Sequence, residues 1–558
     1  MKRKLLSLLL VALLLFSCSA YANTFIVTSN ADSGPGTLRE ALQTAAFNGT
    51  TVYDTILFNL PGSTFADRTI TIFGTLVLSS KVIVDGTSQP GTNFGVSDAK
   101  IILNRGVELC TGLFMSNEDN IGLYGIWFKN FDYIDNLTGD CHGYSIMMNH
   151  VKNIAVGKLN KGNAFSNQNI NSIFHKNYFG IDYLNPIAFA DTINIEYNYF
   201  GLDDAGLGLD NVNQEGISLW NGRNVIINHN YGNCYAAVGS ASETGNGYIR
   251  FTNNNFSNPI NSQIHGKGAL AVTLQGLTAQ FVTYDLTITG NKITNDNQYC
   301  IIIWDMHGSI LIDNNVLGEF YDIQNEPDLN FGIGVIRCVT SYTGKITNNV
   351  IQNRKKGVWL VNCGKVFISK NSIFCTDKGI DIQNPIYNVP VVSLKNITST
   401  SIEGQTSPGL KVELFYTDTC INLCENGKFY LGNTIADANG IFSFPYTGIG
   451  LISATTSTVD SITSEFNGVK VDTIHAVVKN ATCGVNNGSI TGIVILNASS
   501  WQWENELGQV ISTIDTNLYN LSPGKYRLIL QEANVSCPVI TRFFEILSYP
   551  QPVLTGNP

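Results

Sequence analysis

The sequence contains few charged residues and few histidines. Asp, Glu, Lys and Arg make up only 14% of its 558 residues, and histidine occurs seven times. With 52 glycines and abundant asparagine, this composition favours β-structure with many turns over helical bundles. The formal net charge of −10 argues against a nucleic-acid partner.

Long apolar runs are also scarce. Beyond Phe16, no run approaches the roughly 18 residues that a membrane helix needs, so we expect no membrane span. The run that does exist follows three basic residues, extends from Leu5 to Phe16 and precedes Ala20-Tyr21-Ala22. This pattern is typical of a secretory signal peptide, here residues 1–22, and predicts an extracellular or outer-surface location. A lipid anchor at Cys18 is a less favoured alternative, because Phe16 is bulky for that motif.

A short phrase that ends in asparagine recurs through the middle of the chain. The aligned asparagines are Asn177, Asn198, Asn230, Asn255, Asn291, Asn315, Asn349 and Asn371. Their spacings of 21 to 36 residues suit solenoid coils with loop insertions. In seven of the eight copies a large apolar residue stands three positions earlier, within an alternation of period two that indicates strands with one buried face.

This repeat predicts an all-β chain in which residues 23–385 form a right-handed parallel β-helix, with residues 23–100 as its N-terminal cap. Asparagine tolerates left-handed corners, and its amide can bond the equivalent asparagines of neighbouring coils. An antiparallel sandwich array is the alternative, but hairpin signals are sparse.

A helix is expected within the cap, over residues 36–46. Thr37 and Glu40 have the spacing of a capping box at its start. The helix should place one apolar stripe over the open end of the coils. The stripe consists of Leu38, Ala41, Leu42 and Ala45.

Three sequence blocks follow one another near the N-terminus. They are Asp32-Ser-Gly-Pro-Gly-Thr-Leu-Arg-Glu-Ala-Leu42, Asp54-Thr-Ile-Leu-Phe-Asn-Leu-Pro-Gly62 and Val84-Asp-Gly-Thr-Ser-Gln-Pro-Gly91. Together they resemble a family of exported Bacteroidetes surface proteins, and the resemblance covers residues 23 to about 385. It implies a β-helix of the pectin-lyase type.

Two further regions show the pattern of small β-sandwiches. Residues 386–468, with Ile402-Glu-Gly-Gln-Thr406, resemble an immunoglobulin-like or carboxypeptidase-regulatory-like module. Residues 469–548, with Trp501-Gln-Trp503 and Leu521-Ser-Pro-Gly524, resemble an adhesin repeat of gliding-motility proteins. Members of the family continue into a sorting domain for type IX secretion, so residues 549–558 are interpreted as a linker or a truncated C-terminus.

The cysteines divide into candidate disulfides and candidate buried thiols. Cys420 with Cys424, and Cys483 with Cys537, are the predicted disulfide pairs of an exported chain. Single cysteines among apolar residues, such as Cys234, Cys300 and Cys338, are expected to be buried thiols.

Two aspartates form the candidate catalytic pair. Asp182 and Asp203 are 21 residues apart, as are Asn177 and Asn198, so they should stack on neighbouring coils. A separation of one coil, near 5 Å, suits the nucleophile and acid of a retaining glycosidase. Both aspartates occupy the same turn phrase, however, and we favour a structural role in which each accepts backbone N–H bonds.

Three tryptophans are candidates for stacking on sugar rings. Trp220, Trp304 and Trp359 lie 10, 11 and 12 residues before their coil asparagines. On an unbroken strand the odd offset of Trp304 places it on the opposite face from the other two. Packing at the core or edge is therefore the favoured interpretation.

No metal site or cofactor is expected. Calcium at the turns that begin at Asp32 and Asp437 is the weak alternative, since neither turn has the spaced carboxylates of a calcium loop. We expect an exported structural or adhesive protein that binds a glycan or a cell-surface protein. A polysaccharide lyase or glycoside hydrolase of the β-helix type is the second hypothesis.

Overall fold

A computed structural model describes most of the chain between Ala22 and Tyr549. The described ranges are 22–49, 51–107, 109–131, 143–166, 173–175, 191–209, 215–220, 222–233, 235–240, 247–257, 270–274, 283–294, 299–318, 330–338, 344–398, 400–417, 426–447, 451–458, 462–468, 470–472, 476–482, 485–496, 498, 500–531, 539–541 and 543–549. The chain divides into two compact units, residues 1–234 and residues 235–558, described separately as unit 1 and unit 2.

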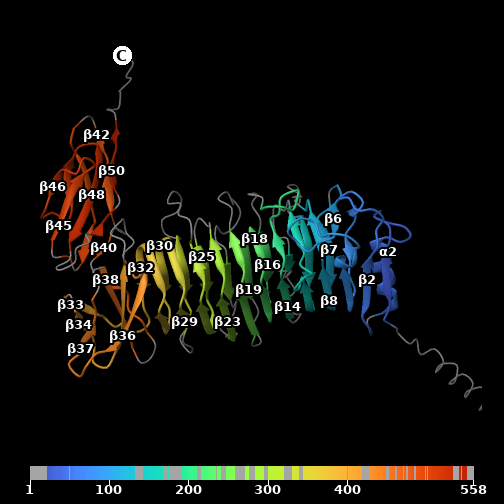
Figure 1. The fold of residues 1–558 in the computed structure, drawn as a ribbon, viewed down its shortest axis with the longest axis horizontal. Coiled ribbons are helices and arrows are strands. Elements are labelled where there is room, and N and C mark those ends of the chain that lie inside the picture. The colour runs from blue at the N-terminus through green and yellow to red at the C-terminus, as the bar shows by residue number, and fades with distance from the viewer. Residues whose placement is uncertain are drawn as a thin grey trace, which may run out of the picture. The chain divides into compact units, whose positions relative to one another are not determined.

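Unit 1 consists of three ladders of parallel strands that recur in a fixed order along the chain (Figure 1). The first ladder is β1 (Thr24–Val27), β2 (Asp54–Phe58), β5 (Val82–Asp85), β8 (Asp119–Tyr124), β11 (Lys152–Val156), β14 (Asp191–Glu196) and β17 (Val225–Asn228). The second is β3 (Thr69–Ile72), β6 (Ile101–Arg105), β9 (Ile126–Lys129), β12 (Ala164–Ser166), β15 (Tyr199–Phe200) and β18 (Tyr231–Asn233). The third is β4 (Leu76–Val77), β7 (Thr111–Ser116), β10 (Tyr144–Asn149), β13 (Ile173–His175) and β16 (Glu215–Trp220).

Unit 2 begins with strands in the same cyclic order. Its first ladder is β20 (Gly247–Thr252), β23 (Thr283–Thr289), β26 (His307–Asp313), β29 (Gly344–Thr347) and β31 (Val366–Ser369). Its second ladder is β21 (Asn255–Ser257), β24 (Lys292–Thr294) and β27 (Val316–Leu317), and its third is β19 (Tyr235–Ser240), β22 (Leu270–Leu274), β25 (Tyr299–Trp304) and β28 (Phe331–Ile336). The long strands β30 (Val350–Val361) and β32 (Ser372–Gln383) run through both the second and third ladders.

These pairings match the predicted architecture at its coarse level. Parallel strands cannot be joined by a tight hairpin, so the chain must travel around before it pairs with itself. Each turn therefore adds one strand to each ladder. The result is a nearly all-β chain with long stacked parallel sheets, compatible with a β-helix. Its right-handed sense and its family remain predictions.

Alternate residues of each strand fill the interior of the coils. Ile195 in β14 is fully buried and lies in register with the equally buried Ile227 of β17. The Phe165 ring stacks between Phe128 and Phe200, at centroid distances of 5.1 and 4.9 Å. Burial of each such side chain stabilises the fold by about 1.5–3 kcal/mol. The expected alternation of buried and exposed residues is thus confirmed, and the apolar interior is the main stabilising feature of the coils.

A column of buried asparagines marks the corner between the first and second ladders. In unit 1 it contains Asn163, Asn198 and Asn230, and in unit 2 it contains Asn254, Asn291, Asn315, Asn349 and Asn371. In each unit, every side-chain amide of the column except the last donates to the side-chain carbonyl oxygen of the next asparagine at 2.9–3.0 Å. The predicted bonding between equivalent asparagines is therefore confirmed.

Asn315 shows how completely the column satisfies its polar groups. Its Oδ1 accepts both the backbone N–H and the side-chain amide of Asn291, each at 2.9 Å. Its own amide donates to Asn349 Oδ1 and to the Ile288 carbonyl of the preceding coil, each at 2.9 Å. Because every strong donor and acceptor of the side chain has a partner, the buried amide stabilises one register of the coils.

Two of the eight aligned asparagines are not the ones in the column. Asn163, and not Asn177, precedes Asn198; the phrase before Asn177 forms β13, which pairs with β10 and β16 in the third ladder. Asn177 itself lies outside the described residues. In unit 2 the buried member is Asn254, whereas Asn255 is exposed. The alignment failed there because the two amides are adjacent in sequence and only the register distinguishes them.

The left-handed conformation at this corner belongs to the residue before the buried asparagine. Tyr197, His229, Asn253, Asn314, Asn348 and Lys370 have φ between 53° and 60°, and Gly290 has φ 68°. For a residue with a Cβ this conformation costs roughly 1–2 kcal/mol. The corner is thus held in a strained conformation by the hydrogen bonds of the asparagine that follows.

The helix α2 (Leu38–Asn48) forms where the sequence predicts it. The Thr37 hydroxyl accepts the Glu40 N–H at 3.3 Å, and the Glu40 carboxylate accepts the Gly36 N–H at 2.6 Å. Its buried residues are the predicted stripe, Leu38, Ala41, Leu42 and Ala45. The helix contacts β1, β2 and β4. Its role as a cover for the coil end remains a prediction.

Antiparallel sheets follow the coils in unit 2. The first group is β33 (Ser393–Ile397), β34 (Ser401–Gln405) and β37 (Ile441–Pro445), with β36 (Phe429–Ile435), β35 (Lys411–Thr417), β38 (Leu451–Ser457) and β39 (Asn467–Gly468). The second includes β46 (Val510–Ser512), β45 (Ser500–Asn505), β48 (Gly524–Gln531), β49 (Val539–Ile540) and β50 (Phe544–Ile546), and β41 (Val477–Lys479), β43 (Gly488–Thr491) and β47 (Leu518–Leu521). Each group has its own apolar cluster, around Leu414 and Trp503 respectively. The predicted module types and domain boundaries remain predictions.

Within the described ranges, no helix has both the length and the apolar character that a bilayer crossing requires.

Candidate ligand-binding sites

Trp304 and Trp359 lie on one face of the third ladder in unit 2. Trp304 is in register with Ile336, and Trp359 is in register with Gly334, two residues earlier on the same strand. Residues two apart on a strand share a face, so the predicted placement on opposite faces is wrong.

The error has a local cause in the length of one corner. Trp304 and Val361 occupy equivalent positions, because both are in register through Ile336. The first ladder resumes at Ile310, six positions after Trp304, but at the equivalent Val366, only five positions after Val361. Counting back from the asparagine therefore shifts the apparent face of Trp304 by one residue.

Around the two tryptophans is a cluster that we call the aromatic face. It consists of Tyr299, Ile302, Trp304, Phe331, Ile336 and Trp359, of which Trp304, Ile336 and Trp359 are half-buried and the others buried. The Phe331 ring stacks on Tyr299 at 5.6 Å and lies 5.1 Å from the Trp359 ring. A Cβ on Gly334 would approach the Phe331 ring to 2.3 Å, so only glycine leaves room for this arrangement.

Charged side chains border the aromatic face. Lys356 Nζ lies 4.4 Å from the centroid of the Trp359 ring and 3.1 Å from the Asp381 carboxylate. That carboxylate also contacts Lys378 at 2.6 Å, and Lys378 contacts Glu465 at 2.8 Å. Two cations and two anions thus form a compact cluster beside the aromatic rings.

Asp381 and Lys378 are held in their charged forms. Burial would raise the pKa of Asp381, but hydrogen bonds and charges from Lys378 and Lys356 outweigh it and lower the pKa. Burial would lower the pKa of Lys378, but Asp381 and Glu465 outweigh it and raise the pKa. Both shifts move the pKa values further from neutral pH. General acid–base catalysis needs a pKa near the working pH. The geometry suits binding better than proton transfer.

The predicted carboxylate pair finds no support in the register. Asp182 lies outside the described residues. Asp203 accepts the backbone N–H groups of Ala205 and Leu207 at 3.1 and 2.9 Å, which is the contact expected of a turn aspartate. Because β13 belongs to the third ladder, the spacing argument that placed Asp182 above Asp203 no longer holds.

Disulfides occur at two cysteines that the predicted pairs do not include. Cys110 and Cys375 each take part in a disulfide, which sequence reasoning missed. Cys300, Cys338 and Cys363 are buried thiols, as predicted for the first two. The remaining candidates lie outside the described residues: Cys234, Cys420, Cys424, Cys483 and Cys537. The side chain of Trp220 does so as well.

Both turns that were considered for calcium make ordinary protein contacts. Asp32 pairs with Arg39 at 2.6 Å. Asp437 accepts the backbone N–H groups of Asn439 and Ile441, each at 2.8 Å. Across the described part of the chain, no group of three His, Cys, Asp or Glu residues is arranged to hold a metal.

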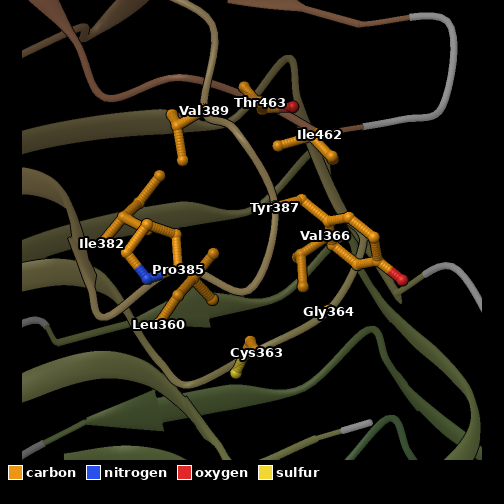
Figure 2. A pocket seen from close by; sticks show the side chains of 10 residues that line it. All are labelled: Leu360, Cys363, Gly364, Val366, Ile382, Pro385, Tyr387, Val389, Ile462 and Thr463. Atoms are coloured by element: carbon orange, nitrogen blue, oxygen red, sulfur yellow. The ribbon is translucent and has the colours of Figure 1, made fainter. Parts of the chain in front are cut away.

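A small apolar pocket of about 20 Å³ lies where the coils end (Figure 2). Leu360, Cys363 and Val366 contribute from the last coils, and Ile462 and Thr463 from the segment after β38. The rest of its lining is Gly364, Ile382, Pro385, Tyr387 and Val389. A larger hollow of about 390 Å³ shares Ile382, Pro385 and Val389 with this pocket and reaches Glu465.

Comparison with known proteins adds little to this description. No family model matches the chain, and no curated protein matches it. Among solved structures, the BSP domain of a biofilm-associated protein is similar at 9% identity and a TM-score of 0.11. That match covers 30% of this chain and 30% of the other, and a likeness of this size carries no argument.

Proposed function

We propose that this chain is an exported structural and adhesive protein whose aromatic face binds a glycan. The observation that carries the proposal is the placement of Trp304 and Trp359 on one face, two strands apart. Two strand spacings, about 9.6 Å, combined with an offset of two residues, about 6.6 Å, put the two positions about 12 Å apart, which is the scale of a short oligosaccharide. Partly exposed indole rings offer apolar surface to the faces of sugar rings. In the neighbouring cluster, Lys378 and Glu465 are partly exposed and offer hydrogen-bonding partners to hydroxyl groups.

Export is a separate part of the proposal. It rests on the signal-like residues 1–22 and on the disulfides at Cys110 and Cys375, since disulfides persist mainly in oxidising compartments. We also infer a right-handed β-helix of the Bacteroidetes surface type, with immunoglobulin-like and adhesin-repeat modules and secretion by the type IX route. The two groups of antiparallel sheets, each with its own core, support the modular part of this inference.

A glycan array followed by titration of the best ligand tests the proposal. The mature chain should bind at least one oligosaccharide class, and Trp304→Ala should weaken that binding about tenfold, or 1.4 kcal/mol. Trp501→Ala, which removes a tryptophan from the C-terminal sheets, is the matched control and should bind like the wild type. An array without any binding, or equal binding by Trp304→Ala, would count against the proposal.

The alternative of a polysaccharide lyase or hydrolase rested on Asp182 stacked with Asp203, and the register gives that pair no support. Release of reducing ends or unsaturated products from a polysaccharide panel would reveal such an activity.

A further inference from the structure

The last coil of unit 2 completes its hydrogen bonding differently from the coils before it. At the asparagine corner of an inner coil, a backbone N–H donates to a carbonyl oxygen of the next coil, as Asn348 does to Ser369 at 3.3 Å. Lys370 occupies the same corner of the last coil, whose strands β31 and β32 end their ladders among the described residues. Its N–H donates to the Glu413 carboxylate of β35 at 3.0 Å. A side chain of the antiparallel sheets therefore takes the place of the next coil's carbonyl.

Glu413 is buried and bonded through both oxygens at this contact. The residue is only 2% exposed. While one oxygen accepts the Lys370 N–H, the other accepts the Ser369 hydroxyl at 2.6 Å and Lys411 Nζ at 2.7 Å. A buried carboxylate is stable only where such partners replace its lost water. These bonds fix β35 at one position against the last coil.

The outer edge of β32 is bonded in the same way by Asn426 and Gly427. Gly427 exchanges two backbone bonds with Ile373, at 2.7 and 2.9 Å. The Asn426 amide donates to the Thr376 carbonyl at 2.7 Å, and its Oδ1 accepts the Gly379 N–H at 2.9 Å. A Cβ on Gly379 would approach Asn426 Cβ to 2.7 Å, so glycine is what allows this close contact.

The segment after β38 bonds the two ends of the same edge. Thr463 donates its N–H to the Val366 carbonyl at 3.3 Å, and its hydroxyl oxygen accepts the Ile368 N–H at 2.9 Å. The Glu465 carboxylate accepts the Ile382 N–H at 2.9 Å. The bonded backbone groups therefore run from Val366, where β31 begins, to Ile382, near the end of β32.

Together these contacts cover a strand edge that would otherwise be open. An open edge presents unpaired N–H and C=O groups and pairs readily with another chain. The end of a solenoid needs a cover for the same reason. Because the coils of unit 2 already pair in parallel with coils of their own kind, the strands that fit this edge best are those of a second copy of this chain.

We propose that the first group of antiparallel sheets, β33–β39, is the end cap of the coils, and that it prevents a second copy of this chain from pairing with their last edge. All the edge contacts described above come from residues 413–465, which belong to this group. The cap acts by imitation, since its carboxylates, amide and hydroxyl bond the backbone groups that a following coil would bond. This role is separate from glycan binding.

Variants of the full mature chain test the cap by hydrogen exchange and sedimentation velocity. The cap variant replaces three bonding side chains: Glu413→Ala, Asn426→Ala and Thr463→Ala. The matched control replaces the same residue types where their bonds stay within the second group: Asn487→Ala, Glu504→Ala and Thr541→Ala. In the cap variant the amides of Lys370 and Gly379 should exchange about tenfold faster or more, and the protein should associate as its concentration rises. The control and the wild type should remain monomeric, with slow exchange at both amides.

A further readout distinguishes opening of the cap from unfolding of the coils. The Asn291 amide, which donates to Asn315 at 2.9 Å inside the column, should keep its protection in the cap variant. If that protection is lost, Gly379→Ala decides, because it keeps every bonding side chain and displaces the cap by its Cβ alone. It should show the same fast exchange at Lys370 and the same association. Fast exchange at Lys370 in the wild type, or a variant with folded coils that keeps wild-type exchange or stays monomeric, would overturn the proposal.

Discussion

Two left-handed corners of the coils in unit 2 share a backbone conformation but differ in the side chain that follows. At the first corner, Asn314 with φ 55° precedes the buried Asn315. At the second, Arg337 with φ 52° precedes the buried Cys338. The asparagine is bonded on both sides within its column, whereas the inward position of the second corner holds a thioether on one coil and a thiol on the next.

The difference distinguishes what the backbone turn requires from what the side chain after it requires. A corner needs only the backbone turn, but an asparagine column constrains the residue type of every coil, because one unpaired amide leaves buried groups without partners. The second corner lacks that constraint and can therefore hold different side chains on successive coils without changing the fold. The predictions below test this contrast.

The largest effect is expected at the first corner. Asn315→Ala leaves the Asn291 amide groups and the Ile288 carbonyl buried without their partner. We expect the free energy of unfolding to fall by about 3–5 kcal/mol, measured by urea denaturation. Asn314→Gly keeps the left-handed turn and should change it by less than about 1 kcal/mol. A loss below about 1 kcal/mol for Asn315→Ala would remove the contrast between the corners.

The next prediction concerns the charged side chains that border the aromatic face, on the outside of the coils. Asp381→Asn leaves Lys356 and Lys378 without their shared carboxylate, and we expect a loss of about 3 kcal/mol at pH 7. Because the folded-state pKa of Asp381 is lowered, its stabilisation is present above the ordinary value of 3.8 and is lost as the pH falls through the folded-state pKa. Urea denaturation from pH 7 to pH 3 should show a smaller acid-induced loss in Asp381→Asn. Equal losses in both proteins would contradict the assignment.

The smallest effect is expected at the second corner. Cys338→Ala removes one buried sulfur that belongs to no amide column, so the free energy of unfolding should fall by only about 1 kcal/mol. Cys300→Ala, at another buried thiol, should show a similar loss. A decrease as large as that of Asn315→Ala would mean that both corners constrain their residue types equally.

The repeat could be predicted from sequence because its cause is local. Alternating apolar residues such as Leu286 and Ile288 need only a period of two, and the asparagine of the corner, Asn291, follows them closely. The helix at Leu38–Asn48 could be predicted for the same reason, since Thr37 and Glu40 form a local cap.

What sequence reasoning missed depends on pairing between coils. Asn254 and Asn255 are identical as residues, and only the strand register decides which one is buried. Trp304 was assigned to the wrong face because one corner is longer by a residue. Cys338 and Cys363 stand 25 residues apart without a recognisable motif, and their equivalent positions on neighbouring coils become visible only when the third ladder is aligned.

A double-mutant cycle across the asparagine column tests the central claim most directly. Unfolding free energies of the single and double Ala variants of Asn254 and Asn291 should show a coupling of about 1–2 kcal/mol, because the two amides bond at 3.0 Å. The same cycle with Asn255 in place of Asn254 should be additive. Coupling through Asn255, with additivity at Asn254, would contradict the register on which the column and both corners rest.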